Sequence, residues 1–291
     1  MKTLFIPCTV DGLDANSGSA MIRARWVAKY WEGAEVYDGT QGLRGWDLVV
    51  FQKAYLSDLA RGLIHKLSSL RATEKKPLIA FDLCDPDFLE PGHRKRILDA
   101  LPVFDFAVSP TQPLADWLGQ YLPAYVIADR LDPDAFEGNR RAIFDNENPL
   151  LGWIGYKGNM SALLAGDMGG VIQRMELNAE IVGVDRPKPF EDWIADVVGF
   201  DILLNPRPNV SQYRYKSENK TIIGWALGVP VAETVGELLT LIDPKKRHQI
   251  IDTWTKIDIL KVYHVEKSVT DWLQVYEIER AQMSERRVNA E

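Results

Sequence analysis

Short apolar runs alternate with amphipathic segments along the first 130 residues, and this alternation constrains the fold more than any other feature. The runs are rich in Val, Ile, Leu and Phe, and the segments between them carry apolar residues at helical spacing. Runs at 3–7, 35–38, 47–52, 77–83, 106–110 and 125–129 alternate with expected helices near 19–31, 57–71, 91–101 and 112–121. Strand, helix and strand in this order predict an α/β protein with a parallel, doubly wound sheet.

A second series of the same kind follows residues 132–149, where Pro, Gly, Asn and charged residues interrupt the alternation as a connection between domains would. Strands are expected at 150–155, 179–184, 201–206 and 229–233, with helices at 160–175, near 190–197 and after Ser217, and a helical pattern from 243 onward. The sequence therefore predicts two lobes, 1–140 and 150–262, each with a Rossmann-like parallel sheet. A last segment, 263–291, could cross back to the first lobe.

Composition excludes several classes of protein. No apolar run of the 291 residues is long enough to span a membrane, and no leader is recognisable, so we expect a cytoplasmic protein. The net charge of −7 counts against non-specific binding to nucleic acid, although it leaves a local basic groove open. Two cysteines and four scattered histidines offer no metal-ligand spacing, and no G-x-G-x-x-G follows the first strand, so we expect no metal and no classical dinucleotide site.

Three cations surround the expected start of a helix in SQYRYKSENKTIIGWALGVPV, namely Arg214, Lys216 and Lys220, with Ser217 as the expected N-cap. Each cation there opposes the helix dipole by about 0.3 to 1 kcal/mol, and Lys216 and Lys220, four residues apart, repel each other. A bound anion such as a phosphate would reverse both effects. The alternative is a solvated loop whose lysines point away. Arg207, in the preceding Pro-rich loop, is a further possible phosphate contact.

The segment KSENKTIIGWALGVPVAET resembles the donor-binding segment of GT-B glycosyltransferases, in particular the family-4-like group. Ala226, Gly228, Pro230 and Val231 match the Ala-x-Gly-x-Pro-Val run that ends the family's helix. The resemblance implies a GT-B fold, with two Rossmann-like parallel-sheet lobes facing a cleft. It also implies that the donor's diphosphate binds at the helix start, on Lys216, Ser217, Asn219 and Lys220, with Arg214 nearby.

Two further stretches fit the same resemblance. LGWIGYKGN would place Gly155, Tyr156 and Lys157 beside the donor phosphates. In DANSGSAMIRARWVAKYW, the small-residue loop resembles loops of the superfamily that face the interlobe cleft. The resemblance implies positions near the donor phosphate or the acceptor for Ser17, Gly18, Ser19 and Arg23.

The carboxylates of FDLCDPDFL follow an expected strand, where open α/β sheets place functional groups. Asp82 and Asp85 are the candidate catalytic acid or base, whereas Asp87 fits the turn chemistry of Asp-Pro-Asp. The family has a pair of glutamates, the second of which commonly holds the donor's ribose. The pair would fall at Tyr215 and Ile223, neither of which is acidic, and Glu233 or Glu218 could substitute.

The resemblance implies a hexosyltransferase-like enzyme that moves a sugar from a nucleotide-diphosphate sugar, such as a UDP-sugar, to an unidentified acceptor. It further implies retention of configuration, no metal and no cofactor beyond the nucleotide-sugar substrate. Three alternatives stay open: a phage-type glycosyltransferase acting on a modified base in DNA, a non-catalytic nucleotide-sugar binding protein, and a phosphometabolite enzyme such as an epimerase. A small molecule, a glycan or a modified nucleic acid could each be the acceptor.

Overall fold

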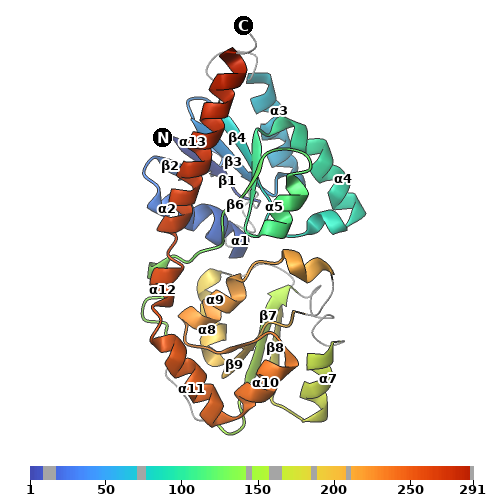
Figure 1. The fold of residues 1–291 in the computed structure, drawn as a ribbon, viewed down its shortest axis with the longest axis vertical. Coiled ribbons are helices and arrows are strands. Elements are labelled where there is room, and N and C mark those ends of the chain that lie inside the picture. Colours follow the sequence, from blue (N-terminus) through green and yellow to red (C-terminus); the bar gives the residue numbers. More distant parts are fainter. Residues whose placement is uncertain are drawn as a thin grey trace. The chain divides into compact units, whose positions relative to one another are not determined.

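The computed structural model describes residues 1–8, 18–70, 77–141, 146–156, 166–184, 189–207 and 211–288. The chain forms two compact units (Figure 1). Unit 1 consists of Met1–Arg130, Arg214–Ser217 and Val265–Glu291, and unit 2 consists of Leu131–Tyr213 and Glu218–His264.

Unit 1 is built on a six-stranded parallel sheet with the order β2-β1-β3-β4-β5-β6. The central strands β3 and β4 are buried along their whole length, which explains their continuous apolar sequences. The strands are β1 Thr3–Ile6, β2 Ala34–Val36, β3 Leu48–Gln52, β4 Leu78–Asp82, β5 Phe106–Ser109 and β6 Ala124–Val126.

Helices cover the sheet of unit 1, and the last of them comes from the far end of the chain. Figure 1 shows α13 running along the unit beside α2. Trp272 of α13 is fully buried, with its ring 5.9 Å from Phe5 and 6.4 Å from Phe106. The helices are α1 Gly18–Ala20, a π-helix Met21–Arg25, α2 Trp26–Tyr30, α3 Asp58–Leu70, α4 Pro91–Ala100, α5 Gln112–Leu118 and α13 Glu266–Val288, with 3₁₀ helices at Ala54–Leu56, Asp87–Leu89 and Leu101–Val103.

Unit 2 has a four-stranded parallel sheet with the order β10-β9-β7-β8. Its core includes Leu151, Ile202 and Leu238. The strands are β7 Leu151–Tyr156, β8 Ala179–Val184, β9 Ile202–Leu204 and β10 Val231–Ala232. The helices are α7 Asp167–Arg174, α8 Phe190–Gly199, α9 Asn219–Ala226, α10 Val235–Ile242, α11 Pro244–Thr255 and α12 Ile259–Val262, with a 3₁₀ helix at Pro133–Ala135. A further 3₁₀ helix, Ser211–Tyr215, begins in unit 2 and ends in unit 1.

The predicted parallel sheets are confirmed, but one expected helix start was wrong and one helix was missed. Helix α9 begins at Asn219, and its N-cap is Glu218 without a side-chain cap bond, not Ser217. Helix α10 was not expected, although Thr234 and Glu237 form a capping box that marks its start. Residues 160–165 of the expected helix at 160–175 lie outside the described residues. In the part of the chain that the structure describes, no helix is long and apolar enough to cross a membrane.

Candidate functional site

A cluster of charged side chains lies at the carboxyl ends of β3 and β4 in unit 1, the edge where parallel α/β sheets place functional groups. Lys53 directly follows β3, and its Nζ lies 2.5 Å from Oδ2 of Asp85 and 3.3 Å from Oδ2 of Asp87. Lys216 approaches the same carboxylate, with its Nζ 2.5 Å from Oδ1 of Asp85. Each oxygen of Asp85 therefore has its own lysine. We call Lys53, Asp85, Asp87 and Lys216 the lysine–aspartate centre.

The short segment that carries Lys216 is anchored on unit 1 by the residue before it. Tyr215 is 6% exposed, and its ring meets Phe88 edge-on with centroids 5.1 Å apart. Its carbonyl accepts a hydrogen bond of 3.0 Å from Thr111 Oγ1. Arg214 lies over the ring of Tyr215, 4.6 Å from its centroid. These contacts fix the position of Lys216 against Asp85.

The lysines decide the charge of the centre. Burial alone would raise the pKa of Asp85, but attraction to Lys53 and Lys216 outweighs it and lowers the pKa well below its usual range. Burial alone would lower the pKa of Lys53, and attraction to Asp85 raises it well above its ordinary value. Burial raises the pKa of Tyr55, whose neutral hydroxyl donates to Asp87. At neutral pH Asp85 is therefore an ionised carboxylate beside the ammonium group of Lys53.

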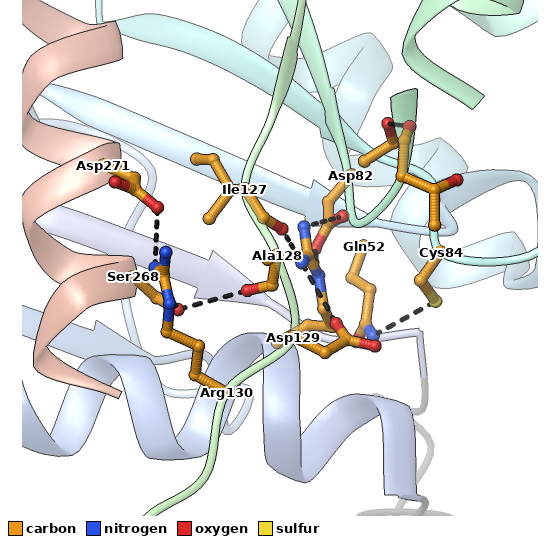
Figure 2. Close-up of polar contacts among 12 residues, drawn as sticks. Gln52, Asp82, Cys84, Ile127, Ala128, Asp129, Arg130, Ser268 and Asp271 are labelled. Carbon is orange, nitrogen blue, oxygen red and sulfur yellow. Dashed lines mark hydrogen bonds and ion pairs between the residues drawn. The ribbon is translucent and has the colours of Figure 1, made fainter. Parts of the chain in front are cut away.

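Asp82 and Arg23, both expected in a site, pair with each other inside unit 1. Asp82 Oδ1 and Oδ2 accept bonds of 2.8 and 3.1 Å from the Arg23 guanidinium, which also bonds Asp129 Oδ1 at 3.1 Å and the carbonyl of Ile127. Figure 2 shows the three residues that accept these bonds, Asp82, Ile127 and Asp129. Burial raises the pKa of Asp82 despite the pull of Arg23, and Asp82 is fully buried. This arrangement links the carboxyl end of β4 to the chain after β6.

In unit 2, Lys220 lies in the first turn of α9 and reaches the strand β7. Its Nζ donates to the carbonyl of Ile154 at 2.8 Å and lies 5.3 Å from the centre of the Trp153 ring. Gly155 follows, and a Cβ there would lie 2.6 Å from the same ring, so only glycine fits. Lys216 and Lys220 thus have separate partners, Asp85 and Ile154.

A second polar cluster in unit 2 lies at the carboxyl ends of β9 and β10, centred on Glu233. Its Oε1 accepts from Asn205 Nδ2 at 3.2 Å, from Arg207 Nε at 3.0 Å and from the hydroxyl of Thr221. Sequence reasoning named Glu233 and Arg207 but missed Asn205 and Thr221. The signal for Asn205 was its position directly after a buried strand end.

The remaining expected site residues are more scattered. Gly18 begins α1, and Ser19 Oγ lies 4.0 Å from Cys8 Sγ. Tyr156 ends β7 and Asn219 begins α9. Ser17 and Lys157 lie outside the described residues. Across the described ranges, no group of three or more His, Cys, Asp or Glu residues is arranged to hold a metal ion.

Two parallel sheets of six and four strands, each flanked by helices, define the GT-B class of fold for this chain. The structure is similar to that of an alpha-glucosyltransferase solved in complex with UDP and a 13-mer DNA containing a central A:G mismatch. The TM-score is 0.50 at 10% sequence identity, over 95% of this chain and 93% of the other.

An alpha-glucosyltransferase in complex with UDP-glucose and DNA containing an abasic site gives a TM-score of 0.39 at 9% identity, over 93% and 94% of the two chains. No family model and no curated protein matches the sequence. At these identities the likeness establishes the fold alone.

Proposed function

We propose that this protein is a glycosyltransferase that moves a hexose from a nucleoside diphosphate sugar, with UDP-glucose as the first candidate, to an acceptor hydroxyl. The observation that carries the proposal is the likeness over 95% of the chain to an alpha-glucosyltransferase whose solved complex holds UDP. The family-4-like segment at the start of α9 supports the same activity independently, because that resemblance rests on the amino-acid sequence and not on the fold.

In this proposal unit 2 binds the donor. The ammonium of Lys220 and the N–H groups of the first turn of α9 suit a diphosphate, which would gain charge-assisted hydrogen bonds there. Glu233, held by Asn205 and Arg207, is a carboxylate suited to ribose hydroxyls. The proposed donor contacts of unit 2 are Gly155, Tyr156, Lys157, Asn219 and Lys220. The proposal adds Arg214, Lys216 and Ser217 from the segment directly before α9, which belongs to unit 1.

Unit 1 supplies the acceptor side of the reaction. Asp85, kept ionised by two lysines, is suited to stabilising the positive charge that develops on a sugar as its bond to the diphosphate breaks. Asp82, paired with a buried arginine, is better suited to structure than to proton transfer. Retention of configuration without a metal is part of the proposal and rests on the family-4-like segment.

A thermal-shift panel of UDP, GDP, ADP, CMP and UDP-glucose tests donor binding. A nucleotide at about 100 times its dissociation constant stabilises a protein by roughly 2.7 kcal/mol. Losing a charge-assisted contact costs about 1.5 to 3 kcal/mol, so Lys220→Met should weaken binding roughly 10- to 100-fold. Lys245→Met is the matched control, because Lys245 is exposed in the first turn of α11 in the same unit.

No shift with any nucleotide would contradict the donor site, and an equal loss in both variants would mean that Lys220 makes no specific contact. A donor that binds but is never hydrolysed or transferred, even over long incubation, would indicate a non-catalytic binding protein instead.

A modified base in DNA is the acceptor that one observation favours, since the similar alpha-glucosyltransferase was solved with DNA. Glycosyl transfer to a base needs a nucleophilic hydroxyl, so the test is a duplex bearing hydroxymethylated bases, incubated with UDP-glucose and followed by mass spectrometry. The same duplex without the hydroxymethyl groups is the control. Addition of a hexose only to the hydroxymethylated duplex would support a DNA acceptor, and transfer to small sugars alone would exclude it.

A further inference from the structure

Lys53 has an unusual backbone for a residue with a side chain. Its φ of 46° and ψ of 42° put it in the left-handed region immediately after β3. Such a conformation costs an L-residue roughly 1 to 2 kcal/mol, and glycine or asparagine normally takes the position. Strain of this kind persists where the surrounding structure fixes it, often at functional sites.

Hydrogen bonds of the backbone and ion pairs of the side chain together hold Lys53 in this conformation. Its N–H donates to the carbonyl of Asp82 at 2.9 Å, and its carbonyl accepts from the N–H of Leu56 at 3.0 Å. Its side chain is 10% exposed and ends between Asp85 and Asp87. A glycine would satisfy the backbone without strain, so what the lysine adds at this position is an ammonium group between two carboxylates.

The two lysines on Asp85 are not equivalent. The side chain of Lys216 is 37% exposed, so solvent screens its attraction to Asp85 more strongly than that of Lys53. Lys216 also belongs to the proposed donor contacts and could exchange Asp85 for a phosphate. Lys53, buried and fixed by its backbone, is the permanent partner of the carboxylate.

We propose that Lys53 is a positioning residue of the lysine–aspartate centre. Through its strained backbone and buried ammonium group, Lys53 holds the carboxylates of Asp85 and Asp87 in one orientation. This inference rests on the proposed function and deepens it, because it names the group that prepares Asp85 for the acceptor reaction. Lys53 acts through Asp85 and does not itself contact the reacting atoms.

Other charged or titratable groups around Asp85 set the background for its titration. Asp87 of the 3₁₀ helix Asp87–Leu89 and Tyr55 of the 3₁₀ helix Ala54–Leu56 act on Lys53 together with Asp85, and His93 of α4 lies against Tyr55 with ring centroids 5.8 Å apart. Lys53 and Lys216 act directly on the Asp85 carboxyl, and the other titratable groups of the neighbourhood are Tyr55, Asp82 with Arg23 behind it, Cys84, Asp87 and His93.

The test separates the charge of Lys53 from its backbone. Lys53→Gly keeps the left-handed conformation and removes the ammonium, and Lys53→Asn, which also tolerates that conformation, is the second variant should glycine impair folding. Lys53→Arg restores the charge. Lys95→Met is the matched control, because it removes an exposed ion pair of 2.7 Å between Lys95 and Asp99 in the same unit.

Two readouts are made on the full chain: the titration of the Asp85 carboxyl by ¹³C NMR, and turnover of UDP-glucose by transfer or hydrolysis. The folded pKa of Asp85 lies below its unfolded value of about 3.9, so its pairing stabilises the fold above that pH and is lost as pH falls through the folded value. In Lys53→Gly this titration should move to higher pH, and turnover should fall on the order of 100-fold. Lys53→Arg should restore both, and Lys95→Met should change neither.

An Asp85 titration in Lys53→Gly or Lys53→Asn identical to that of the wild type would overturn the proposal. So would wild-type turnover in the variant, or a fall in turnover without a shift in the titration. Failure of the proposed function has a different signature: the wild type would neither bind UDP nor turn over UDP-glucose, while the titration would still report whether Lys53 controls Asp85.

Discussion

Several buried charges of this protein lie opposite charges of the other sign, and the Arg23 group is the clearest case. Arg23 holds Asp82 and Asp129 while its guanidinium is almost completely buried. Removing one member of a buried ion pair leaves the other charge without compensation, which is far more costly than losing an exposed pair. A structural role and a catalytic role of Asp82 therefore predict different effects when its charge is removed.

We predict that Asp82→Asn lowers the free energy of unfolding by about 3 to 5 kcal/mol, because Asp129 is then the one charged partner that Arg23 keeps among the residues that the structure describes. Urea denaturation measures the change. Asp58→Asn, which removes an exposed pair with Arg61 in the same unit, should cost about 1 kcal/mol or less. An Asp82→Asn protein as stable as the wild type but without transferase activity would instead assign Asp82 to catalysis.

Cys84 provides a second test at this scale. Burial raises the pKa of its thiol well above the ordinary value, in spite of the attraction of Lys53. The thiolate is the reactive form, so raising the pKa leaves less of it at a given pH. We predict that iodoacetamide at pH 8 alkylates Cys84 slowly in the folded protein and rapidly in urea, as followed by mass spectrometry. Rapid alkylation of the folded protein would contradict a buried, protonated thiol.

Sequence reasoning found Asp85 but not Lys53, and the reason is physical. Asp85 is a carboxylate after a strand, which is a pattern that one sequence can show. Lys53 is also placed after a strand, but a lysine there is ordinarily solvated. Its burial depends on Asp85 and Asp87, which lie 32 residues or more away in sequence. Its left-handed backbone is equally invisible, because no glycine or asparagine marks it.

Helices and strands were easier to predict because their periodicity is local. The strands of both sheets were located to within a few residues, since parallel strands buried on both faces form continuous apolar runs. The N-cap of α9 was predicted one residue too early, because helix boundaries depend on caps of one or two residues, and α10 was not predicted. Close packing between elements was also beyond reach, and Gly224 of α9 is an example.

Gly224 allows α9 to approach the edge of its sheet. A Cβ there would lie 2.5 Å from Val231 Cγ2 and 3.1 Å from the carbonyl of Val229. We predict that Gly224→Ala lowers the free energy of unfolding by about 1 to 2 kcal/mol, because overpacking outweighs the gain in helix propensity. The urea midpoint reports the change.

Gly62 is the matched control, since it lies in the interior of α3, and a Cβ added there would meet nothing within 4 Å. Gly62→Ala should raise stability by about 0.5 to 1 kcal/mol. Equal gains in both variants would show that α9 does not need a glycine against β10.

At the scale of the whole molecule, the course of the chain is more complex than one connection between two units. The chain passes from unit 1 to unit 2 after Arg130, returns for the four residues Arg214–Ser217, and returns again at Val265. Those four residues directly precede Glu218, the N-cap of α9. The proposed donor-binding helix of unit 2 is thus joined covalently to a segment whose contacts are with the lysine–aspartate centre of unit 1.

Tyr215 attaches this segment to unit 1, and truncating its side chain should affect residues that are distant in the sequence. Tyr215 packs on Phe88, Phe88 stacks on Trp117 at 4.0 Å, and Trp117 contacts the exposed Tyr121. We predict that Tyr215→Ala destabilises unit 1 by roughly 3 kcal/mol, as truncation of buried aromatic side chains does. Hydrogen exchange measured by mass spectrometry should then rise in the 3₁₀ helix Asp87–Leu89 and in α4.

Tyr121→Ala removes the ring at the other end of the same aromatic row, but that ring is 43% exposed, so it should change stability by about 0.5 kcal/mol or less. Comparing the stabilities of Tyr215→Ala and Tyr121→Ala shows whether loss of any ring in this row destabilises unit 1 or whether Tyr215 has a specific role. If exchange near Asp87 were as slow in Tyr215→Ala as in the wild type, the segment Arg214–Ser217 would contribute nothing to unit 1. Lys216 would then hold its place beside Asp85 without this anchor.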